Sequence, residues 1–337
     1  MTPAIRITGT GSAFPAARVS NHKIADKLAA SGIDTSDQWI IERTGIKERR
    51  CSDLTKAGES NAGLSAAAAE NALEMAGKSA SEIDLIIVAT CSPDTLIPST
   101  ACWLQHKINA SRAWAMDINA ACTGFIYAVV TAGQFIMTRQ IRTALVIGSE
   151  VLHPVLNWKD RASCILFGDG AGAAVLEGVS ADHDHRILSW HLHSDGKYGD
   201  LLYIPSAGDN RTTPVAPEPD GLFKMVMNGR EIFKVAVRTL TDFAQTALQA
   251  NGLTVDDLDW FVPHQANLRI LEAVAHRLHI PREKILINID RYGNTSAATI
   301  PTMMDEAVRD GRIKPGHLLL MDAFGAGFTF GSMLLRW

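Results

Sequence analysis

The sequence has 337 residues and a mass of 36.4 kDa, a length that predicts two domains or one large unit with two cores. Its 32 basic and 36 acidic residues leave a net charge of −4, which argues against a nucleic-acid-binding protein with a basic patch. Hydrophobic residues make up 47%, so the chain can bury a sizeable core. We find no apolar run of the ~18 residues that span a membrane and no secretory signal at residues 1–15, and we expect a cytoplasmic protein without membrane contact.

Short apolar runs alternate with helical patterns along the whole chain, which is typical of α/β architecture. An Ala-rich helix is predicted at 60–76, and the following run at 84–90 is apolar on both faces, as in a buried strand. Next come a strand at 113–118 and an apolar helix at 123–138. The remaining predicted strands are 143–149, 171–177, 258–263, 317–323 and 331–337.

A shared local pattern indicates that the chain is a duplication. Residues 168–175 (GDGAGAAV) and 324–332 (FGAGFTFGS) are both glycine turns before a closing strand, and the strand separations in the two halves are similar. We place the boundary near Gly178, which gives halves at 1–178 and 179–337. The proline-rich segment 209–221 is interpreted as an exposed excursion.

The five cysteines form no C-x-x-C pair, and their odd number argues against a disulfide framework. Cys122 lies at the predicted junction between the strand at 113–118 and the helix at 123–138. At such a junction, unpaired N–H groups and the helix dipole would stabilise a thiolate and an oxyanion. The alternative is that Cys122 is a small buried residue, as most free cysteines are.

Two polar positions in the second half are further candidates. His264 directly follows a buried strand, where α/β folds place their sites, although it could instead cap a backbone group. Asn294 lies in a Gly-Asn-Thr-Ser turn before an Ala-rich helix, a pattern that also suits a helix N-terminus. Neither residue decides the function by itself.

Two other patterns carry little weight. His183 and His185, like His191 and His193, form an H-x-H pair, but alternation along strands explains both pairs as well as a metal does, and we expect no metal. The glycine turns are not followed by Gly-Lys-Ser/Thr and precede strands, so they favour neither a P-loop nor a dinucleotide site.

Taken together, the ordered motifs resemble the β-ketoacyl-acyl-carrier-protein synthase III family of condensing enzymes over nearly the whole chain. The motifs are DTSDQWIIERTGI (34–46), AACTGF (120–125), FGDGAGAAVL (167–176), VPHQANLRI (262–270), YGNTSAAT (292–299) and DEAVRDGRIKPG (305–316). The resemblance implies an α/β thiolase fold, with duplicated halves and mixed five-stranded sheets in a layered αβαβα arrangement. It also implies a homodimer.

The resemblance implies a catalytic triad of Cys122, His264 and Asn294. Cys122 would take an acyl group from a coenzyme A thioester, and malonyl-acyl carrier protein would then lose carbon dioxide and attack the acyl-cysteine, which initiates fatty acid synthesis. Neutral His264 and Asn294 would donate hydrogen bonds to the enolate oxygen. The backbone N–H groups of Cys122 and Ala326 would form an oxyanion hole; Ala326 replaces a glycine of many relatives, but only its N–H is required.

Substrate contacts are implied in the same way. Trp39 and Arg161 match the pair that sandwiches the coenzyme A adenine by stacking and cation–π contact. Further coenzyme contacts match Thr35, Arg43 and Asn267, and contacts to the acyl carrier protein match Lys234, Arg269 and Arg277. No separate cofactor is expected, because the coenzyme A thioester is a substrate.

The segment 92–99 (SPDTLIPS) matches the loop that crosses the dimer interface and closes the partner's acyl pocket. Leu96 and Ile97 would gate that pocket, and Ile97 stands where acetyl-preferring relatives have phenylalanine. One side chain discriminates by ~1–3 kcal/mol, so we expect some activity beyond acetyl starters, while the preferred starter stays open.

Three alternatives remain. A specialised condensing or acyl-transfer enzyme of secondary metabolism would share the fold, but such relatives often alter the histidine or asparagine, and this chain keeps both. A thioesterase-like cysteine hydrolase would need a general base, whereas Asn294 suits a donor role. A catalytically silent scaffold is disfavoured, because every expected reactive residue is present.

Overall fold

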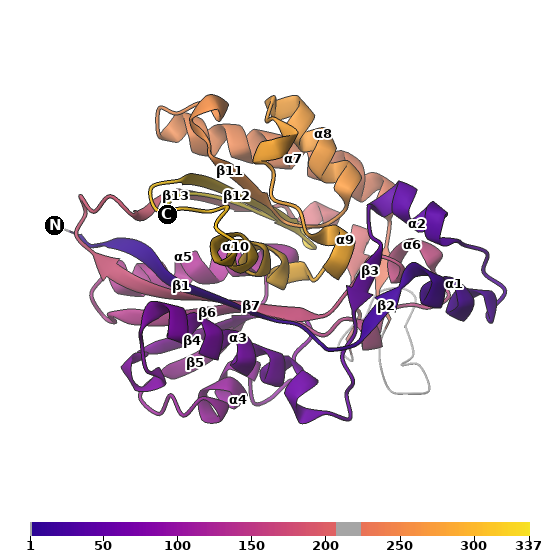
Figure 1. Cartoon of the computed structure of the whole chain (residues 1–337), viewed down its shortest axis with the longest axis horizontal. Coiled ribbons are helices and arrows are strands. Elements are labelled where there is room, and N and C mark those ends of the chain that lie inside the picture. The colour runs from indigo at the N-terminus through magenta and orange to yellow at the C-terminus, as the bar shows by residue number, and fades with distance from the viewer. Residues whose placement is uncertain (1, 207–223) are drawn as a thin grey trace.

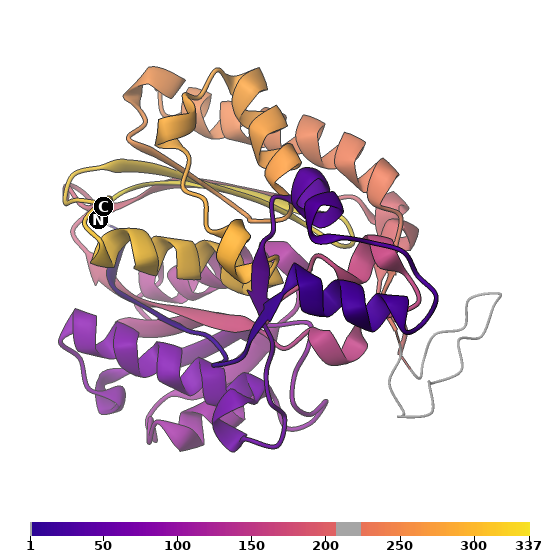
Figure 2. The same ribbon diagram turned by 45° about the vertical axis from the view of Figure 1, so that its right-hand side comes forward.

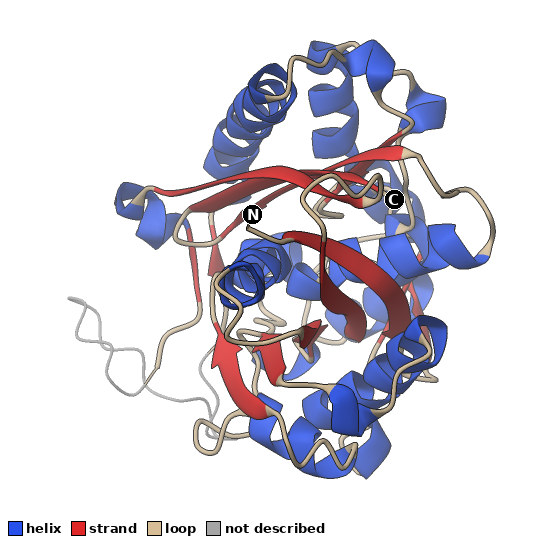
Figure 3. Ribbon diagram, turned by 90° about the vertical axis from the view of Figure 1, so that its left-hand side faces the viewer, coloured by secondary structure: helices blue, strands red, loops and turns tan. Residues whose placement is uncertain are grey.

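A computed structural model describes residues 2–206 and 224–337, so the proline-rich excursion predicted at 209–221 lies outside the described residues. Two sheets lie one above the other, with helices between them and on both outer faces (Figure 1, Figure 3). This is the predicted αβαβα layering, and the chain has the thiolase fold.

The first sheet has five strands and is mixed. Its order is β1 (Ala4–Ala13), β7 (Gly170–Val179), β6 (Thr143–Glu150), β4 (Leu85–Ala89) and β5 (Trp114–Ile118). Strand β4 is parallel to both of its neighbours, whereas β7 is antiparallel to both of its own. Every residue of β4 and β6 is buried, as their two-sided apolar pattern predicts for strands covered by helices on both faces.

The second sheet repeats this order with one strand fewer among the described residues. It runs β8 (Arg186–Ser194), β13 (Thr329–Arg336), β12 (Leu318–Gly325) and β11 (Trp260–Pro263). The expected fifth strand is reduced to a single parallel bridge between Phe261 and Ile285. The physical reason is Gln265, whose side chain bonds the Leu286 carbonyl at 3.1 Å and the Asn288 N–H at 3.2 Å and so ends the ladder.

The matching strand orders support the duplication. The chain passes from the first sheet to the second between β7 and β8, and we keep Gly178, the next-to-last residue of β7, as the proposed boundary.

Helices form the other three layers. Outside the first sheet lie α3 (Asn61–Ala76) and α4 (Thr100–Lys107); between the sheets lie α5 (Gly124–Met137) and α10 (Thr299–Arg309); outside the second sheet lie α7 (Gly229–Ala250) and α8 (Leu268–Leu278). Glycine permits the close contact of α3 with β1, since a Cβ at Gly11 would lie 2.2 Å from the Ala68 carbonyl oxygen. No helix in the described ranges is long and apolar enough to cross a membrane.

A group of short elements lies at one end of the layers, where α2 contacts α8 (Figure 2). They are β2 (Arg18–Ser20), α1 (Asn21–Ala29), α2 (Asp37–Thr44), β3 (Glu48–Arg50), α6 (Arg161–Cys164), β9 (Leu202–Tyr203), β10 (Val226–Met227) and α9 (Ile289–Tyr292). Buried Arg49 ties this group together, because its guanidinium donates to the Asn21 side chain at 2.7 Å and to the Ile165 carbonyl at 2.6 Å. The Asn21 side chain in turn donates to Asp37, the first residue of α2, at 2.9 Å, so the network joins α2 to Ile165, which directly follows α6.

Candidate active site

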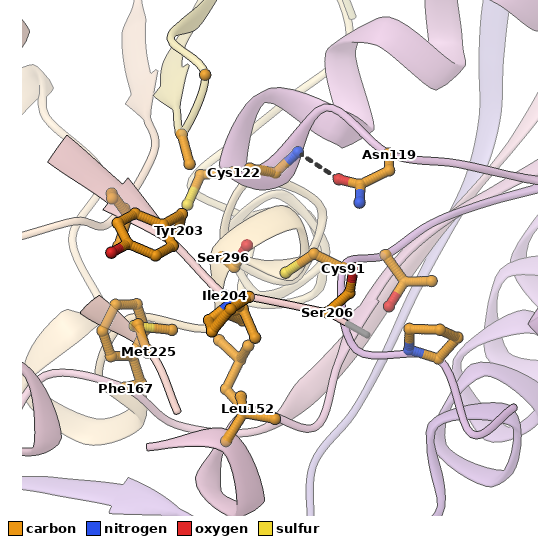
Figure 4. Close-up of a pocket in the computed structure, with 18 of the residues that line it drawn as sticks. Cys91, Asn119, Cys122, Leu152, Phe167, Tyr203, Ile204, Ser206, Met225 and Ser296 are labelled. Atoms are coloured by element: carbon orange, nitrogen blue, oxygen red, sulfur yellow. Dashed lines mark hydrogen bonds between the residues drawn. The ribbon is translucent and has the colours of Figure 1, made fainter. Parts of the chain in front are cut away.

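Cys122 lies in a short turn, Ala121–Thr123, between β5 and α5, at the junction predicted from the sequence. Ala121 has a φ of +47°, a left-handed conformation that costs a residue with a Cβ ~1–2 kcal/mol. Its N–H donates to Oδ1 of Asn119 at 3.1 Å (Figure 4). Backbone strain of this kind concentrates at functional sites, and here it fixes the residue that precedes the sulfur.

The thiol itself is buried, and the predicted thiolate is wrong for the free protein. Burial raises the pKa of Cys122 to about 12, although a hydrogen bond with the Ser296 side chain opposes this rise. Loss of solvation therefore outweighs the stabilising N–H groups and dipole of the junction. A nucleophilic role for Cys122 would require the thiol to lose this proton.

His264 follows β11 and is 2% exposed. Burial lowers its pKa to about 3, so the imidazole is neutral at physiological pH, as the donor role requires. Its Nδ1 lies 2.7 Å from Oγ1 of Thr299, and the same hydroxyl lies 3.0 Å from the Ser296 carbonyl. The Thr299 hydroxyl donates to that carbonyl, so the ring tautomer with its proton on Nε2, which can donate to a ligand, requires the hydroxyl to turn toward Nδ1.

Asn294 is held between the two halves of the chain. Its N–H donates to the Leu166 carbonyl at 2.9 Å, and its own carbonyl accepts from Gly168 at 3.0 Å. The Ser296 N–H occupies Oδ1 of Asn294 at 2.8 Å, which leaves the Nδ2 amide as the group that can donate to a ligand. This geometry suits a donor rather than a base.

Two cavities meet at Cys122. The first, of about 870 Å³, is mainly apolar, and we call it the acyl cavity (Figure 4). Its lining includes Cys91, Leu96, Ile118, Leu152, Val155, Phe167, Ile204, Met225, Ser296 and Ala326. The second, of about 500 Å³, is called the channel here, and it brings the predicted triad together with Trp39, Arg43, Lys234, Asn267 and Arg269.

At the channel entrance, Trp39 contacts two arginines. The guanidinium carbons of Arg43 and Arg161 each lie 4.2 Å from its ring centroid, so Arg161 occupies the face predicted for adenine. A base between these two groups would need a separation of ~7 Å, since stacked atoms lie ~3.5 Å apart. An adenine would therefore have to displace Arg161 from Trp39.

Two other predicted coenzyme contacts lie beside this pair. Oγ1 of Thr35 is buried without a hydrogen-bond partner, an orphan polar group that a ligand could satisfy. Asn267 caps α8 and donates to the Arg43 carbonyl at 3.0 Å, which connects the channel wall to α2.

The predicted carrier-protein residues are exposed basic side chains. Lys234 and Arg269 line the channel, whereas Arg277 lies further along α8 and does not. Lys234 pairs with Glu231 at 2.8 Å, and Arg230 adds a basic group to the channel that the sequence reasoning missed. The position of Arg230 at the start of α7 gave no signal for this role.

The predicted gate residues are among the most exposed hydrophobic side chains, with Leu96 at 91% and Ile97 at 87%. Leu96 borders the acyl cavity of its own chain, whereas Ile97 does not. In the two described ranges, no group of three His, Cys, Asp or Glu could hold a metal ion. Local contacts engage both members of the first H-x-H pair, because His183 bonds the backbone of His185, whose ring bonds the Trp337 carbonyl.

Comparison with known proteins agrees with this geometry. Residues 116–196 match the profile of 3-oxoacyl-(acyl-carrier-protein) synthase III, and residues 248–337 match its C-terminal profile. A β-ketoacyl-(acyl-carrier-protein) synthase III from Alkalilimnicola ehrlichii is 49% identical over 98% of this chain and 99% of its own. The chain belongs to the β-ketoacyl-acyl-carrier-protein synthase III family.

Solved structures place the chain in the same family. The synthase III of Aquifex aeolicus superposes with a TM-score of 0.88 and 40% identity, covering 99% of this chain and all of the other. The priming β-ketosynthase of the R1128 polyketide pathway superposes with a TM-score of 0.89 and 34% identity over 99% and 97% of the two chains.

Proposed function

We propose that this acyltransferase condenses an acyl-coenzyme A starter with malonyl-acyl carrier protein and so initiates fatty acid synthesis. The observation that carries the proposal is the position of Cys122 where an apolar cavity and a basic, aromatic channel meet. The cavity suits an acyl chain and the channel suits the coenzyme. No separate cofactor is required, and we propose that the reaction takes place in the cytoplasm.

In the first half-reaction, Cys122 takes the acyl group and coenzyme A leaves through the channel. The backbone N–H groups of Cys122 and Ala326 stabilise the oxyanion. Trp39, Arg43 and Arg161 bind the nucleotide end, while Thr35 and Asn267 contact the rest of the coenzyme.

In the second half-reaction, malonyl-acyl carrier protein enters by the same channel, guided by Lys234, Arg269 and Arg277. Decarboxylation builds negative charge on its thioester oxygen. Nε2 of His264 and Nδ2 of Asn294 donate to that oxygen, and the carbanion then attacks the acyl-cysteine. The product is a β-ketoacyl-acyl carrier protein.

We further propose a homodimer in which a second copy covers the loop of Leu96 and Ile97. Their exposure supports this, because large apolar side chains clustered on a surface commonly mark an interaction site. A starter longer or more branched than acetyl is supported by the size of the acyl cavity and by isoleucine at position 97.

The proposal is tested by intact-protein mass spectrometry after incubation with acetyl-, butyryl-, isobutyryl- and octanoyl-coenzyme A. We expect a single acyl adduct on the wild-type protein and none on Cys122→Ala. The masses rank the starters, and strict use of acetyl would contradict the prediction of a broader range. Absence of every adduct would reject acylation by coenzyme A thioesters.

A second candidate is a priming enzyme of a specialised pathway, favoured by the similarity to the R1128 priming β-ketosynthase. The two functions differ in the carrier protein that delivers malonate. Condensation rates with carrier proteins of fatty acid and polyketide systems distinguish them, since a preference of more than about tenfold reflects ~1.4 kcal/mol of differential recognition.

A further inference from the structure

The carboxyl group of Glu150, at the end of β6, is a buried acidic group without a role in the two half-reactions. It is 0% exposed, and in the described part of the chain no cation pairs with it. Its donors are Thr90 Oγ1 at 3.2 Å, the Cys91 N–H at 3.2 Å, the Cys91 Sγ at 3.3 Å, Ser92 Oγ at 2.5 Å and Ser296 Oγ at 3.0 Å. Burial raises the pKa of this carboxyl, so the carboxylate is readier to accept a proton than an exposed one.

Ser296 connects this carboxyl group to the nucleophile. Its hydroxyl donates to Oε1 of Glu150 at 3.0 Å, and Ser296 lines the acyl cavity together with Cys122 (Figure 4). The Ser296 side chain also lowers the pKa of Cys122, against the effect of burial. Ser296 has a φ of +50°, a conformation that residues with a Cβ rarely adopt. The fold thus holds this hydroxyl in place against its backbone preference.

We propose that Ser296 and Glu150 form a relay that accepts the thiol proton of Cys122 during acylation. The inference rests on the acyl-transfer function proposed for this site and adds two groups to it. In this relay Ser296 receives the proton directly from the sulfur, and Glu150 acts through Ser296. The path has three atoms in order: Sγ of Cys122, Oγ of Ser296 and Oε1 of Glu150.

The proton and electron balance of the step is simple. As Sγ of Cys122 attacks the thioester carbonyl carbon, its proton passes to Oγ of Ser296, and the serine proton passes to Oε1 of Glu150. The carbonyl carbon then loses its bond to the coenzyme A sulfur. The proton returns along the same path to that sulfur, so acyl-cysteine and free coenzyme A thiol form without net uptake of a proton.

The surroundings favour this pair over other acceptors. The titratable groups facing Glu150 are the Cys91 and Cys122 thiols, and both are neutral when protonated. His264 is the other buried titratable side chain in the channel, and its Nδ1 is already occupied by Thr299. Its pKa of about 3 makes it a weak base at neutral pH, whereas a carboxylate with a raised pKa is better matched to the transfer.

The test is the single-turnover acylation rate, followed by mass spectrometry between about pH 6 and 9. For Ser296→Ala and Glu150→Gln we expect a rate about 10²-fold below wild type at neutral pH, the usual loss for a general base. We also expect the rate of both variants to rise about tenfold per pH unit, because the thiol must then ionise to solvent, while the wild-type rate stays nearly flat. A residue with only a structural role would not change this slope.

Ser149→Ala is the matched control. It removes a buried hydroxyl from the neighbouring residue of β6, and this hydroxyl donates to the Asn61 carbonyl at 3.3 Å and not to Glu150. We expect acylation within about threefold of wild type and an unchanged slope, since general-base assistance is retained. Thermal unfolding checks each variant, and Ser296→Ala decides the question if Glu150→Gln does not fold.

The rate of the condensation half-reaction distinguishes loss of this relay from a general disruption of the active site. Acyl-enzymes of both variants, formed at about pH 9 and returned to neutral pH, should condense with malonyl-acyl carrier protein within about threefold of wild type, because that step carries no thiol proton. Wild-type acylation rates in Ser296→Ala, an equal loss in Ser149→Ala, or loss of both half-reactions would each overturn the relay. Failure of the wild-type protein to acylate would instead reject the proposed function itself.

Discussion

The acyl cavity and the channel differ in what lines them, although Cys122 borders both. Short segments spread over the chain, such as Cys91, Leu152 and Met225, build the apolar wall of the acyl cavity. Helices α2, α7 and α8 supply the channel with tryptophan, arginine, lysine and asparagine side chains. The difference indicates that starter choice and coenzyme affinity are set by separate residues, so each can be changed without the other.

The largest expected effect comes from the donors on the channel side of Cys122. His264→Ala should lower the condensation rate of pre-acylated enzyme by about 10²–10³-fold, because it removes one of the two donors that stabilise the enolate. Acylation of Cys122 should stay within about threefold, since that step uses the backbone oxyanion hole. The two rates are measured separately by quenched flow and mass spectrometry, and an equal loss of both would show that the two sides are not separable.

The burial of the same histidine leads to a prediction about the pH dependence of condensation. Because burial lowers the pKa of His264 to about 3, its neutral form persists down to mildly acidic pH. The wild-type condensation rate should therefore show no loss from histidine protonation between about pH 5 and 8, a range that contains the ordinary histidine pKa of ~6.5. A fall in rate centred near pH 6.5 that disappears in His264→Gln would contradict a neutral, buried ring.

The next largest expected effect is on coenzyme binding alone. Trp39→Ala should raise KM for every acyl-coenzyme A by about 10–30-fold with kcat little changed, because it removes a stacking and cation–π partner worth ~2 kcal/mol when desolvated. Acyl-pantetheine thioesters lack adenine and serve as the control, with an unchanged KM expected. A change in the order of starter preference would contradict the separation of cavity and channel.

The complementary change narrows the acyl cavity. Val155→Phe places an aromatic ring in the apolar wall and should lower the rate with octanoyl relative to acetyl starters by about tenfold, within the ~1–3 kcal/mol that one side chain can discriminate. The contribution of the pantetheine portion of the substrate to KM should not change. Equal loss with every starter would indicate distortion of Cys122 instead of a shorter cavity.

Local features of the site follow from the sequence, whereas its long-range contacts do not. The junction at Cys122 is visible because a strand pattern changes to a helical one within a few residues. The convergence of Cys122 with His264 and Asn294 depends on the two halves packing together, and only the family resemblance indicated it. The relay is even harder to predict from the sequence. Glu150 ends a uniformly buried strand and Ser296 belongs to a turn, so neither local pattern indicates that the two side chains meet.

The degree of solvation of a side chain is the second property that the sequence does not predict. The helix junction predicts a stabilised thiolate, but the depth of Cys122 depends on tertiary packing and reverses the sign of the pKa shift. In the same way, the family resemblance implies five strands in each sheet, whereas the Gln265 side chain takes the backbone hydrogen bonds near Ile285. Both errors arise where a side chain from elsewhere competes with a local preference.

The smallest effect on activity, but a measurable one on stability, concerns the wall behind the channel. The Asp322 carboxyl group on β12 is 0% exposed, and both of its oxygens lack a hydrogen-bond partner. The backbone carbonyl of Asp322 accepts a hydrogen bond from the backbone N–H of His264 at 2.8 Å. Burial raises the pKa of the carboxyl group well above the ordinary value, so the folded protein holds a proton that the unfolded chain releases above about pH 4. The free energy of unfolding should therefore fall as pH rises from about 4 toward the raised pKa, by at most ~1.4 kcal/mol per pH unit from this group.

Asp322→Asn removes this titration while it keeps the size of the side chain. The variant should be more stable than wild type at about pH 8 by ~1–3 kcal/mol and less dependent on pH, because an amide is neutral in both the folded and the unfolded chain and folding then binds no proton at this position. Glu150 contributes a slope of the same sign, because burial raises its pKa too, so the dependence should decrease without vanishing. Urea unfolding of both proteins at several pH values measures this difference. Lower stability of Asp322→Asn across that range would show that the carboxyl group is paired and that the channel wall carries no such penalty.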